Sequence, residues 1–297
     1  MEQTQKNPDG LLRISLMGGQ ARALLINSTT LCETAREVHS LSRVATAALG
    51  RVLTATAMMS EQLKDDRQSL TCIIKGDGPI GKILAVGHAD GSVKGYVDNP
   101  DVDLPRNGKK LPVGDAVGKN GTLSVIKDLN MKEPYVGQVN LVSGEIAEDF
   151  AMYFTASEQT PSLVSLGVLT DDHVLAAGGL IVQMMPGASE AAIQSVELSA
   201  EMFSNISQTI LEFGLEGAVD QLLMHLEPEI LSEITPRYRC DCSRDRVERA
   251  LISLGIKELS EIIEEQGGCE VDCHFCAQKQ VFTKQELTDL VTQLEEK

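Results

Sequence analysis

Five of the seven cysteines lie in two short stretches near the end of the chain. Cys240 and Cys242 are separated by one residue in RCDCSRD, and Cys273 and Cys276 are separated by two residues in CEVDCHFCAQK, which begins with Cys269. Thiolates at such spacings are typical ligands of Zn²⁺, which favours soft donors in a tetrahedral arrangement. The same residues can also form structural disulfides or a redox-active dithiol, so the rest of the chain has to distinguish these chemistries.

The start of the chain and the length of its apolar runs indicate a compartment in which these thiols are kept reduced. The chain begins MEQTQKNPDGLLRISL, which lacks the basic and apolar regions of a signal peptide, and no run approaches the roughly 18 apolar residues that span a bilayer. We therefore expect a cytoplasmic protein, in a compartment where thiols stay reduced. An odd number of clustered cysteines is also not typical of a disulfide framework.

The net charge of −17 and the aromatic fraction of 3% bear on the partners of the protein. A strongly acidic chain is repelled by a phosphate backbone and by an anionic membrane surface, so we expect neither nucleic acid nor a membrane as a partner. A nucleic-acid-binding zinc module, which is a competing function, would need a basic face with aromatic stacking residues, and this composition does not favour one.

We predict that Cys240, Cys242, Cys273 and Cys276 together hold one Zn²⁺ in the reduced protein. The intervening residues 243–272 are long enough for two helices that bring the two pairs together. Zinc binding contributes about 10–16 kcal/mol in small zinc modules, so oxidation of the thiolates would remove that stabilisation. A disulfide across a one-residue gap closes a small ring and is expected to be comparatively easy to reduce. The site is therefore suited to a reversible redox switch, although spacing alone does not establish that it is used as one.

The other thiols and the nearby basic residues have less specific patterns. We expect Cys32 and Cys72 to be small buried side chains and Cys269 to be a bystander, with disulfide exchange at Cys269 as the alternative. His274 is expected to be a neighbour of the site, because four cysteines already complete a structural zinc centre. Four thiolates around Zn²⁺ leave a net negative charge that a basic patch could offset, and the alternative is an ordinary solvated patch. The residues of this patch are Arg237, Arg239, Arg244 and Arg246.

Charge and glycine are unevenly distributed, which predicts three segments. Residues 1–186 contain 19 of the 25 glycines, with 17 basic and 21 acidic residues. Residues 187–236 contain nine acidic residues and no Lys or Arg, and five arginines follow within residues 237–249. We predict an α+β core domain at 1–186, an acidic helical linker at 187–236 and a C-terminal zinc domain with the redox switch at 237–297.

The first segment has the pattern of mixed helices and strands. Strand-like stretches at 70–75, 81–89, 92–97 and 137–144 are bounded by Gly, Pro, Asn and Asp, and Asp90-Gly91 predicts a hairpin turn. Residues 42–63 are small or apolar almost throughout, which predicts a buried helix between sheet layers. The alternative is a helix with one exposed edge.

The second segment predicts helices with one apolar stripe. Apolar residues recur at spacings of three and four, at Ile193, Val196, Ala200, Phe203, Ile206, Ile210 and Phe213. One interpretation is an ordinary amphipathic helix with a solvated acidic face. The other is a marginally held helix, because its acidic residues have no local cation and its order must come from docking on neighbours. In that case Phe203, Ile206, Ile210 and Phe213 form a candidate apolar stripe that opening of the linker would expose.

The third segment predicts short helices around the cysteines. Ser243 can cap a helix that ends at Gly255, and two glycines stop a second helix that begins at Lys257. Thr283 and Glu286 have the spacing of a capping box at the start of a third. Residues 269–282 are typical of strand, tight turn and strand, with Cys273 and Cys276 at the turn.

Together these motifs resemble the redox-regulated heat-shock protein 33 family of bacterial chaperones. The CDC and CHFC pairs and the following QVFTKQEL carry the resemblance, as do GDGPIGKILAVGHADGSVKGYVDNP at 76–100, VGKNGTLSVIKDLNMKEPYVGQVNLVSGEIAEDF at 117–150 and AAGGLIVQMMPG at 176–187. It covers nearly the whole chain. The resemblance implies a layered α+β domain with a buried helix, a helical linker and a small zinc domain.

The resemblance also implies an ATP-independent holdase chaperone and not an enzyme. In that family the reduced, zinc-bound protein is inactive, and oxidation forms disulfides between neighbours, here Cys240 with Cys242 and Cys273 with Cys276. Zinc then leaves, the linker unfolds, and the active and often dimeric protein binds unfolding client proteins. Cys269 departs from the family pattern, and it leaves a second candidate partner for Cys273.

Two enzyme classes compete with this interpretation. A thiol-disulfide oxidoreductase would place CHFC at a helix N-terminus after a strand, whereas here the motif lies late in the chain beside a second pair. A catalytic zinc enzyme needs an open fourth position, which four cysteines do not leave. The glycine-rich GDGPIG at 76–81 has no following Lys-Ser/Thr, so we interpret it as a turn and not as a phosphate loop.

Overall fold

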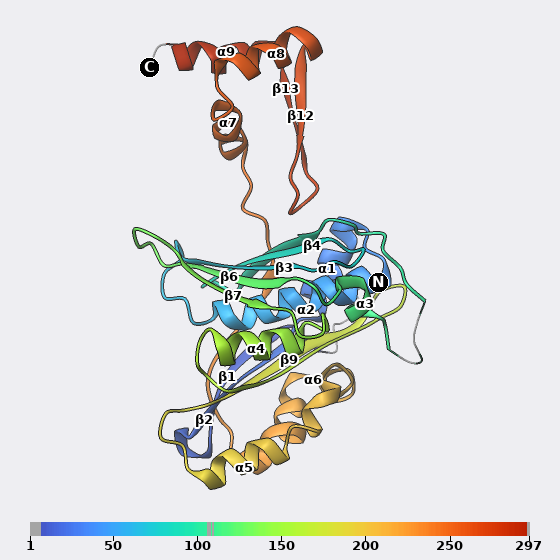
Figure 1. Cartoon of the computed structure of the whole chain (residues 1–297), viewed down its shortest axis with the longest axis vertical. Coiled ribbons are helices and arrows are strands. Elements are labelled where there is room, and N and C mark those ends of the chain that lie inside the picture. Colours follow the sequence, from blue (N-terminus) through green and yellow to red (C-terminus); the bar gives the residue numbers. More distant parts are fainter. Residues whose placement is uncertain (1–6, 106–107, 109, 296–297) are drawn as a thin grey trace. The chain divides into compact units, whose positions relative to one another are not determined.

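The structure, a computed structural model, describes residues 7–105, 108 and 110–295 (Figure 1). It divides into two compact units, Met1–Arg239 and Cys240–Lys297, which we call the core unit and the cysteine unit. The mixed helix and strand content confirms the predicted α+β class. None of the helices in the described part of the chain is both long enough and apolar enough to cross a bilayer.

Two sheets form the frame of the core unit. Sheet A has the order β10-β1-β2-β9-β8, with β1 at Gly10–Leu16, β2 at Ala21–Asn27, β8 at Ser162–Thr170, β9 at Val174–Met184 and β10 at Glu229–Ile234. Sheet B has the order β11-β5-β4-β3-β6-β7, with β3 at Ser69–Lys75, β4 at Lys82–His88, β5 at Ser92–Val97, β6 at Thr122–Asp128, β7 at Tyr135–Asn140 and β11 at Arg237–Tyr238. All strand pairs are antiparallel except β11 with β5, which is parallel.

Helices occupy the space between and beside these sheets. Those before residue 187 are η1 (Met17–Gly19), α1 (Thr29–His39), α2 (Arg43–Ser60), α3 (Val113–Val117) and α4 (Ala147–Ala156). Those after it are α5 (Glu190–Leu198), η2 (Met202–Asn205), α6 (Ile206–Leu223) and η3 (Met224–Leu226). Figure 1 shows α2 between the two sheets and α5 and α6 on the opposite face of sheet A.

Helix α2 is buried on all sides, which confirms the prediction for residues 42–63 and rejects the exposed-edge alternative. Apart from Arg43 and Arg51, every residue of the helix is buried. Glycines of both sheets allow it to lie close: a Cβ at Gly95 would meet Leu53 at 3.0 Å, and one at Gly179 would meet the Met58 side chain at 2.8 Å. The two sheets and α2 therefore share one hydrophobic core.

The predicted strands of sheet B are present, with one shift. Residues 70–75, 81–89 and 92–97 correspond to β3, β4 and β5, and the Asp90-Gly91 turn joins the last two. The strand predicted at 137–144 instead ends at Asn140. The buried Asp149 carboxylate accepts hydrogen bonds from the backbone N–H groups of Val142, Ser143 and Ile146, so this stretch forms the loop that caps α4 and cannot extend the strand.

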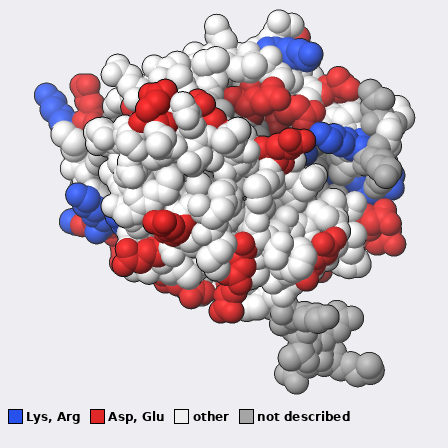
Figure 2. Space-filling model, turned by 90° about the horizontal axis from the view of Figure 1, so that it is seen from below, with Lys and Arg blue, Asp and Glu red and all other residues white. Residues whose placement is uncertain are grey.

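The segment 187–236 covers the outer face of sheet A. Side chains from α5, η2, α6 and η3 form a second core cluster with apolar residues of β1, β2 and β9. Val196, Phe203, Ile206 and Ile210 are buried as the stripe predicts. All nine acidic residues of the segment are exposed, and none pairs with a Lys or Arg that the structure describes. Figure 2 looks at the side that carries α5 and α6, where acidic side chains spread over the face and basic ones lie at its margins.

Two predictions for this segment are wrong in detail. Ala200 is exposed and Phe213 is 50% exposed, so the stripe is not one continuous buried face. The helix is also interrupted before Ile206 by a turn and a 3₁₀ stretch, whereas the break at Gly214, whose φ is 71°, agrees with the glycine that ends the apolar stripe in the sequence. The segment is also not helical throughout, because residues 229–234 form β10 on sheet A.

The cysteine unit has its own small core. It contains α7 (Arg244–Ile252), α8 (Ile256–Gln266), β12 (Gly268–Asp272), β13 (Lys279–Thr283) and α9 (Lys284–Glu295). Ser243 caps α7, Gly267 ends α8 in the left-handed conformation, and Thr283 and Glu286 exchange capping hydrogen bonds at α9, all as predicted. Only five of its described apolar residues are buried, namely Leu251, Leu259, Phe282, Leu287 and Leu290.

Candidate metal centre

The two cysteine pairs lie in a short extended stretch and in a tight turn. Cys240 and Cys242 lie in the extended stretch that leads into α7, where capping by Ser243 fixes the start of the helix. Cys273 and Cys276 lie in the turn between β12 and β13, closed by hydrogen bonds from Cys273 N–H to the Gln278 carbonyl and from Ala277 N–H to the Cys273 carbonyl. The predicted strand, turn and strand around this pair is confirmed.

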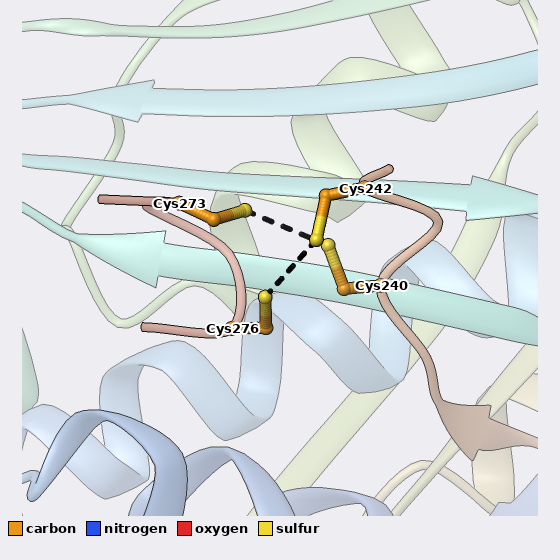
Figure 3. A group of neighbouring side chains, drawn as sticks. All are labelled: Cys240, Cys242, Cys273 and Cys276. Carbon is orange, nitrogen blue, oxygen red and sulfur yellow. Dashed lines mark hydrogen bonds between the residues drawn. The ribbon is translucent and has the colours of Figure 1, made fainter. Parts of the chain in front are cut away.

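The four sulfurs converge on a common point (Figure 3). The four Sγ atoms lie within 4.8 Å of one another, with 3.7 Å between Cys240 and Cys273 and 3.3 Å between Cys242 and Cys276. A tetrahedron of sulfurs at the usual zinc–sulfur distance of about 2.3 Å has edges of about 3.8 Å. These thiols therefore fit a metal ion in tetrahedral coordination, and no other group of three or more potential ligands was found among the described residues.

Protonation of the thiols is shifted by their surroundings. Burial raises the pKa of Cys240 to about 11 and raises the pKa of Cys242 as well, where neighbouring thiols add to the effect. Burial also acts on Cys273, but hydrogen bonds from the backbone N–H groups of Phe275 and Cys276 outweigh it and lower the pKa of that thiol. A cation at the centre would have to displace protons from the thiols with raised pKa values, so metal binding is expected to release protons.

The arginines near the cysteines have carboxylate partners. Arg244 lies 2.6 Å from Glu286 and Arg246 lies 2.6 Å from Asp241. In the core unit Asp90 pairs with Arg237 at 2.7 Å and with Arg239 at 3.8 Å. The predicted basic patch is therefore divided into separate ion pairs, and its charge is already partly compensated.

The remaining cysteines lie outside the cluster. Cys32 and Cys72 are buried in the core unit, as predicted, and burial raises the pKa of each to about 12. Cys269 lies on β12 opposite Phe282, packs against the small core and has its pKa raised by burial. His274 follows Cys273 but does not belong to the group of four convergent ligands.

The glycine-rich stretch at 76–81 is a turn, as interpreted from the sequence. Gly78 and Ile80 donate their backbone N–H groups to the carbonyls of Val117 and Ala116 in α3. A Cβ at Gly78 would lie 2.3 Å from the Ala116 carbonyl oxygen, so glycine is needed for this close approach. These N–H groups are thus used inside the fold and are not free to bind phosphate.

Sequence reasoning missed how the chain is attached to sheet B just before Cys240. Strand β11 pairs with β5 through Arg237 and Tyr238, and the Tyr238 hydroxyl donates to the Gly95 carbonyl. His39 Nε2 lies 2.9 Å from the same hydroxyl. No local signal predicts this attachment, because its partners are far away in the sequence and two residues are too few for a strand pattern.

Comparisons with known proteins agree with this architecture. A model of the Hsp33 protein family matches residues 9–283. The 33 kDa chaperonin of Clostridioides difficile is 46% identical over 290 residues, covering 96% of this chain and 99% of that protein. The 33 kDa chaperonin of Thermoanaerobacter pseudethanolicus is 43% identical over 292 residues, covering 97% and 99%.

A solved structure has the same fold over almost its full length. The 33 kDa chaperonin of Thermotoga maritima, described as a heat shock protein 33 homolog, gives a TM-score of 0.90 at 35% identity and covers 97% of this chain and 99% of that one. Family, relatives and fold agree over the core unit, the segment 187–236 and the cysteine unit. This chain belongs to the heat-shock protein 33 family and is a chaperone.

Proposed function

We propose that this protein is an ATP-independent holdase chaperone whose activity is controlled by the redox state of four cysteines. The convergence of four thiols in a unit with a very small hydrophobic core is the observation that carries the proposal. Reduced and metal-bound, the protein is inactive. Oxidation activates it to hold unfolding client proteins and prevent their aggregation.

The resident metal is Zn²⁺, one per chain, with Cys240, Cys242, Cys273 and Cys276 as ligands. The all-thiolate donor set and the sulfur spacing near that of a tetrahedral site support zinc over harder cations. When bound, the ion cross-links the stretch before α7 to the β12–β13 turn. Four cysteines leave no open position for a substrate, which supports a structural centre and a protein that is not an enzyme.

Oxidation would remove the ligands from the site. Each pair loses two electrons to one hydrogen peroxide, so four thiolates, two peroxides and four protons give two disulfides and four waters. From the family resemblance we propose Cys240 with Cys242 and Cys273 with Cys276. The hydrogen-bonded sulfurs in the structure are those of Cys240 with Cys273 and of Cys242 with Cys276, so neighbour pairing requires the thiols to rearrange.

Loss of the centre is proposed to release the linker at 187–236. Five buried apolar side chains are a small core for an independently stable unit, so the cysteine unit should unfold without its cross-link. The linker has nine exposed acidic residues without a basic partner in the described chain, and it keeps its place by docking on sheet A. Segments held in this way open at a low free energy.

Opening would expose the apolar surfaces that clients bind. Phe203, Ile206 and Ile210 are buried against sheet A and would be uncovered together with that face of the sheet. Exposed apolar area of this kind captures unfolding proteins. We propose that the oxidised protein acts as a homodimer in the cytoplasm, with neither nucleic acid nor a membrane as its partner.

The zinc site can be tested with two Cys→Ser variants, one at a proposed ligand and one at a cysteine outside the site. Reduced wild-type protein should contain about one zinc per chain by elemental analysis. Cys276→Ser should lose nearly all of it, because a ligand is removed, while Cys269→Ser should retain it. Zinc-free reduced protein, or a Cys276→Ser variant with unchanged zinc, would contradict the assignment.

Redox control can be tested by treating the reduced protein with peroxide at heat-shock temperature. Suppression of client aggregation should be low before treatment, high after it, and low again after a dithiol reductant is added. Cys269→Ser should be activated like the wild type, because it takes no part in the proposed pairing. A dominant Cys269–Cys273 link in peptide maps of the oxidised protein would refute that pairing.

Linker control can be tested without touching a cysteine. Phe203→Asp places a charge in a buried site and should weaken docking by at least about 3 kcal/mol, which gives chaperone activity in the reduced, zinc-loaded protein. Phe213→Asp, in the same segment but 50% exposed, should change stability by less than about 1 kcal/mol and leave the protein inactive. If Phe203→Asp stays inactive although hydrogen exchange shows α6 open, linker opening is not the activating step.

A further inference from the structure

We propose that the activated protein captures an extended client segment as an added strand on the edge of β1, in the place that β10 occupies here. The inference rests on the proposed function, because β10 belongs to the segment that opens. It assigns a binding mode to that function, namely backbone pairing with sheet A, in addition to the exposure of apolar side chains.

Strand β10 is a weakly held edge strand. It pairs with β1 at five positions, from Leu11 opposite Ile234 to Ser15 opposite Glu229, and the register is broken between Arg13 and Ile14. On the other side of β1, β2 pairs at seven consecutive positions without a break. An interrupted ladder of this length contributes less than its continuous neighbour, so β10 should separate first.

The side chains of β10 contribute little to its attachment. Five of its six residues are exposed, including Ile230 and Leu231 at 53% each, and only Ile234 packs on the core. The backbone hydrogen bonds to β1 are therefore its main interaction with the sheet. A strand held through its backbone can be replaced by another extended chain, whatever the side chains of that chain are.

Strand β1 is well suited to accept a replacement. Its sequence is GLLRISL, with Arg13 as the single charge and no proline, and five of its seven residues are buried. Strand edges of this composition pair readily with other chains when uncovered, since natural edges are normally protected by charge, proline or a covering element. In this chain the protection comes from β10.

The position of β10 in the chain connects it to the redox centre. Pro228 and Pro236 flank it, β11 follows with only two paired residues, and Cys240 comes next. Unfolding that begins at Cys240 would reach β10 after breaking the two-residue strand β11, the ion pairs of Asp90 with Arg237 and Arg239, and the contacts of the Tyr238 hydroxyl with Gly95 and His39. Removal of β10 also takes Glu229 and Glu233 away from the edge, which lowers repulsion of acidic clients.

The exposed edge of β1 can pair only with an extended polypeptide whose backbone groups are free, which favours unfolding proteins as its ligands. Adding a strand to β1 requires a continuous extended segment with free backbone N–H and C=O groups, which folded proteins rarely expose. The structure already contains one such occupant, the segment EILSEI of this chain. Clients would be recognised through the feature that all unfolded chains share, which suits a chaperone with many clients.

A synthetic peptide of residues 227–236, EPEILSEITP, is a direct probe of this edge. The fluorescently labelled peptide should bind the oxidised protein and bind the reduced protein at least about tenfold more weakly, since β10 covers the edge there. Reduced and alkylated unfolded protein should displace it from the oxidised form. Hydrogen exchange should show that the β1 amides that face β10 lose protection on oxidation and regain it when the peptide or the unfolded protein is added, while those that face β2 stay protected.

Two N-methylated peptides separate backbone pairing from side-chain contact. One carries methyl groups on the amides of Ser232 and Ile234, the other on the amide of Glu233; all three lie in the run that pairs with β1 without a register break. Alternate amides of a strand point to opposite sides, so one of the two peptides should bind about tenfold more weakly and the other about as well as the unmodified peptide.

Two results would overturn the inference. One is equal binding of both methylated peptides, or β1 amides that stay unprotected, while the oxidised protein still suppresses aggregation; then the chaperone function stands and the edge is not its binding site. The other is protection of β1 by dimerisation alone with no displacement by unfolded protein, which would assign the edge to a second copy of the chain. Failure of oxidation to produce any aggregation suppression would instead contradict the proposed function.

Discussion

The structure depends on the convergence of four thiols in a unit that can bury very little else. Beyond Cys240 the described chain has five buried apolar side chains, whereas the core unit packs two sheets around a helix whose residues are almost all buried. We propose that this small unit gains its stability from a metal cross-link between its thiols. When the cross-link is made of thiolates, the stability of the unit becomes sensitive to oxidants, because the ligands are also the oxidisable groups.

The segment 187–236 joins the two-sheet core to the cysteine unit and is held to sheet A by one apolar face. It covers an apolar face of sheet A with Phe203, Ile206 and Ile210, and its exposed acidic residues form no ion pair with a Lys or Arg in the described part of the chain. Its last part, β10, is attached mainly through backbone hydrogen bonds and is followed by the short strand β11 and the first cysteine pair. We propose that this segment opens while the rest of the core unit remains folded.

The sequence predicted best what depends on local patterns. The small and apolar residues at 42–63 identify the buried helix α2. The Asp90-Gly91 pair identifies the turn between β4 and β5, and the two cysteine pairs identify the group of four thiols. Strand β10 was missed because EILSEI has no regular alternation of polar and apolar residues, and its pairing with β1 is a long-range interaction with a register break. The break in α6 at Gly214 has a local signal in the glycine itself, whereas the exposure of Phe213 just before it does not follow from the spacing of apolar residues. The Asp149 loop and the pairing of Asp90 with Arg237 are long-range interactions that no local pattern encodes.

The central claim is that the state of the four thiols controls the docking of the segment 187–236. The most direct measurement is a peroxide titration in which zinc content and hydrogen exchange are determined on the same sample. The account predicts that amides of α6 and β10 lose protection in proportion to the zinc released, while those of α2 remain protected throughout. Complete zinc release with α6 and β10 still protected would contradict it.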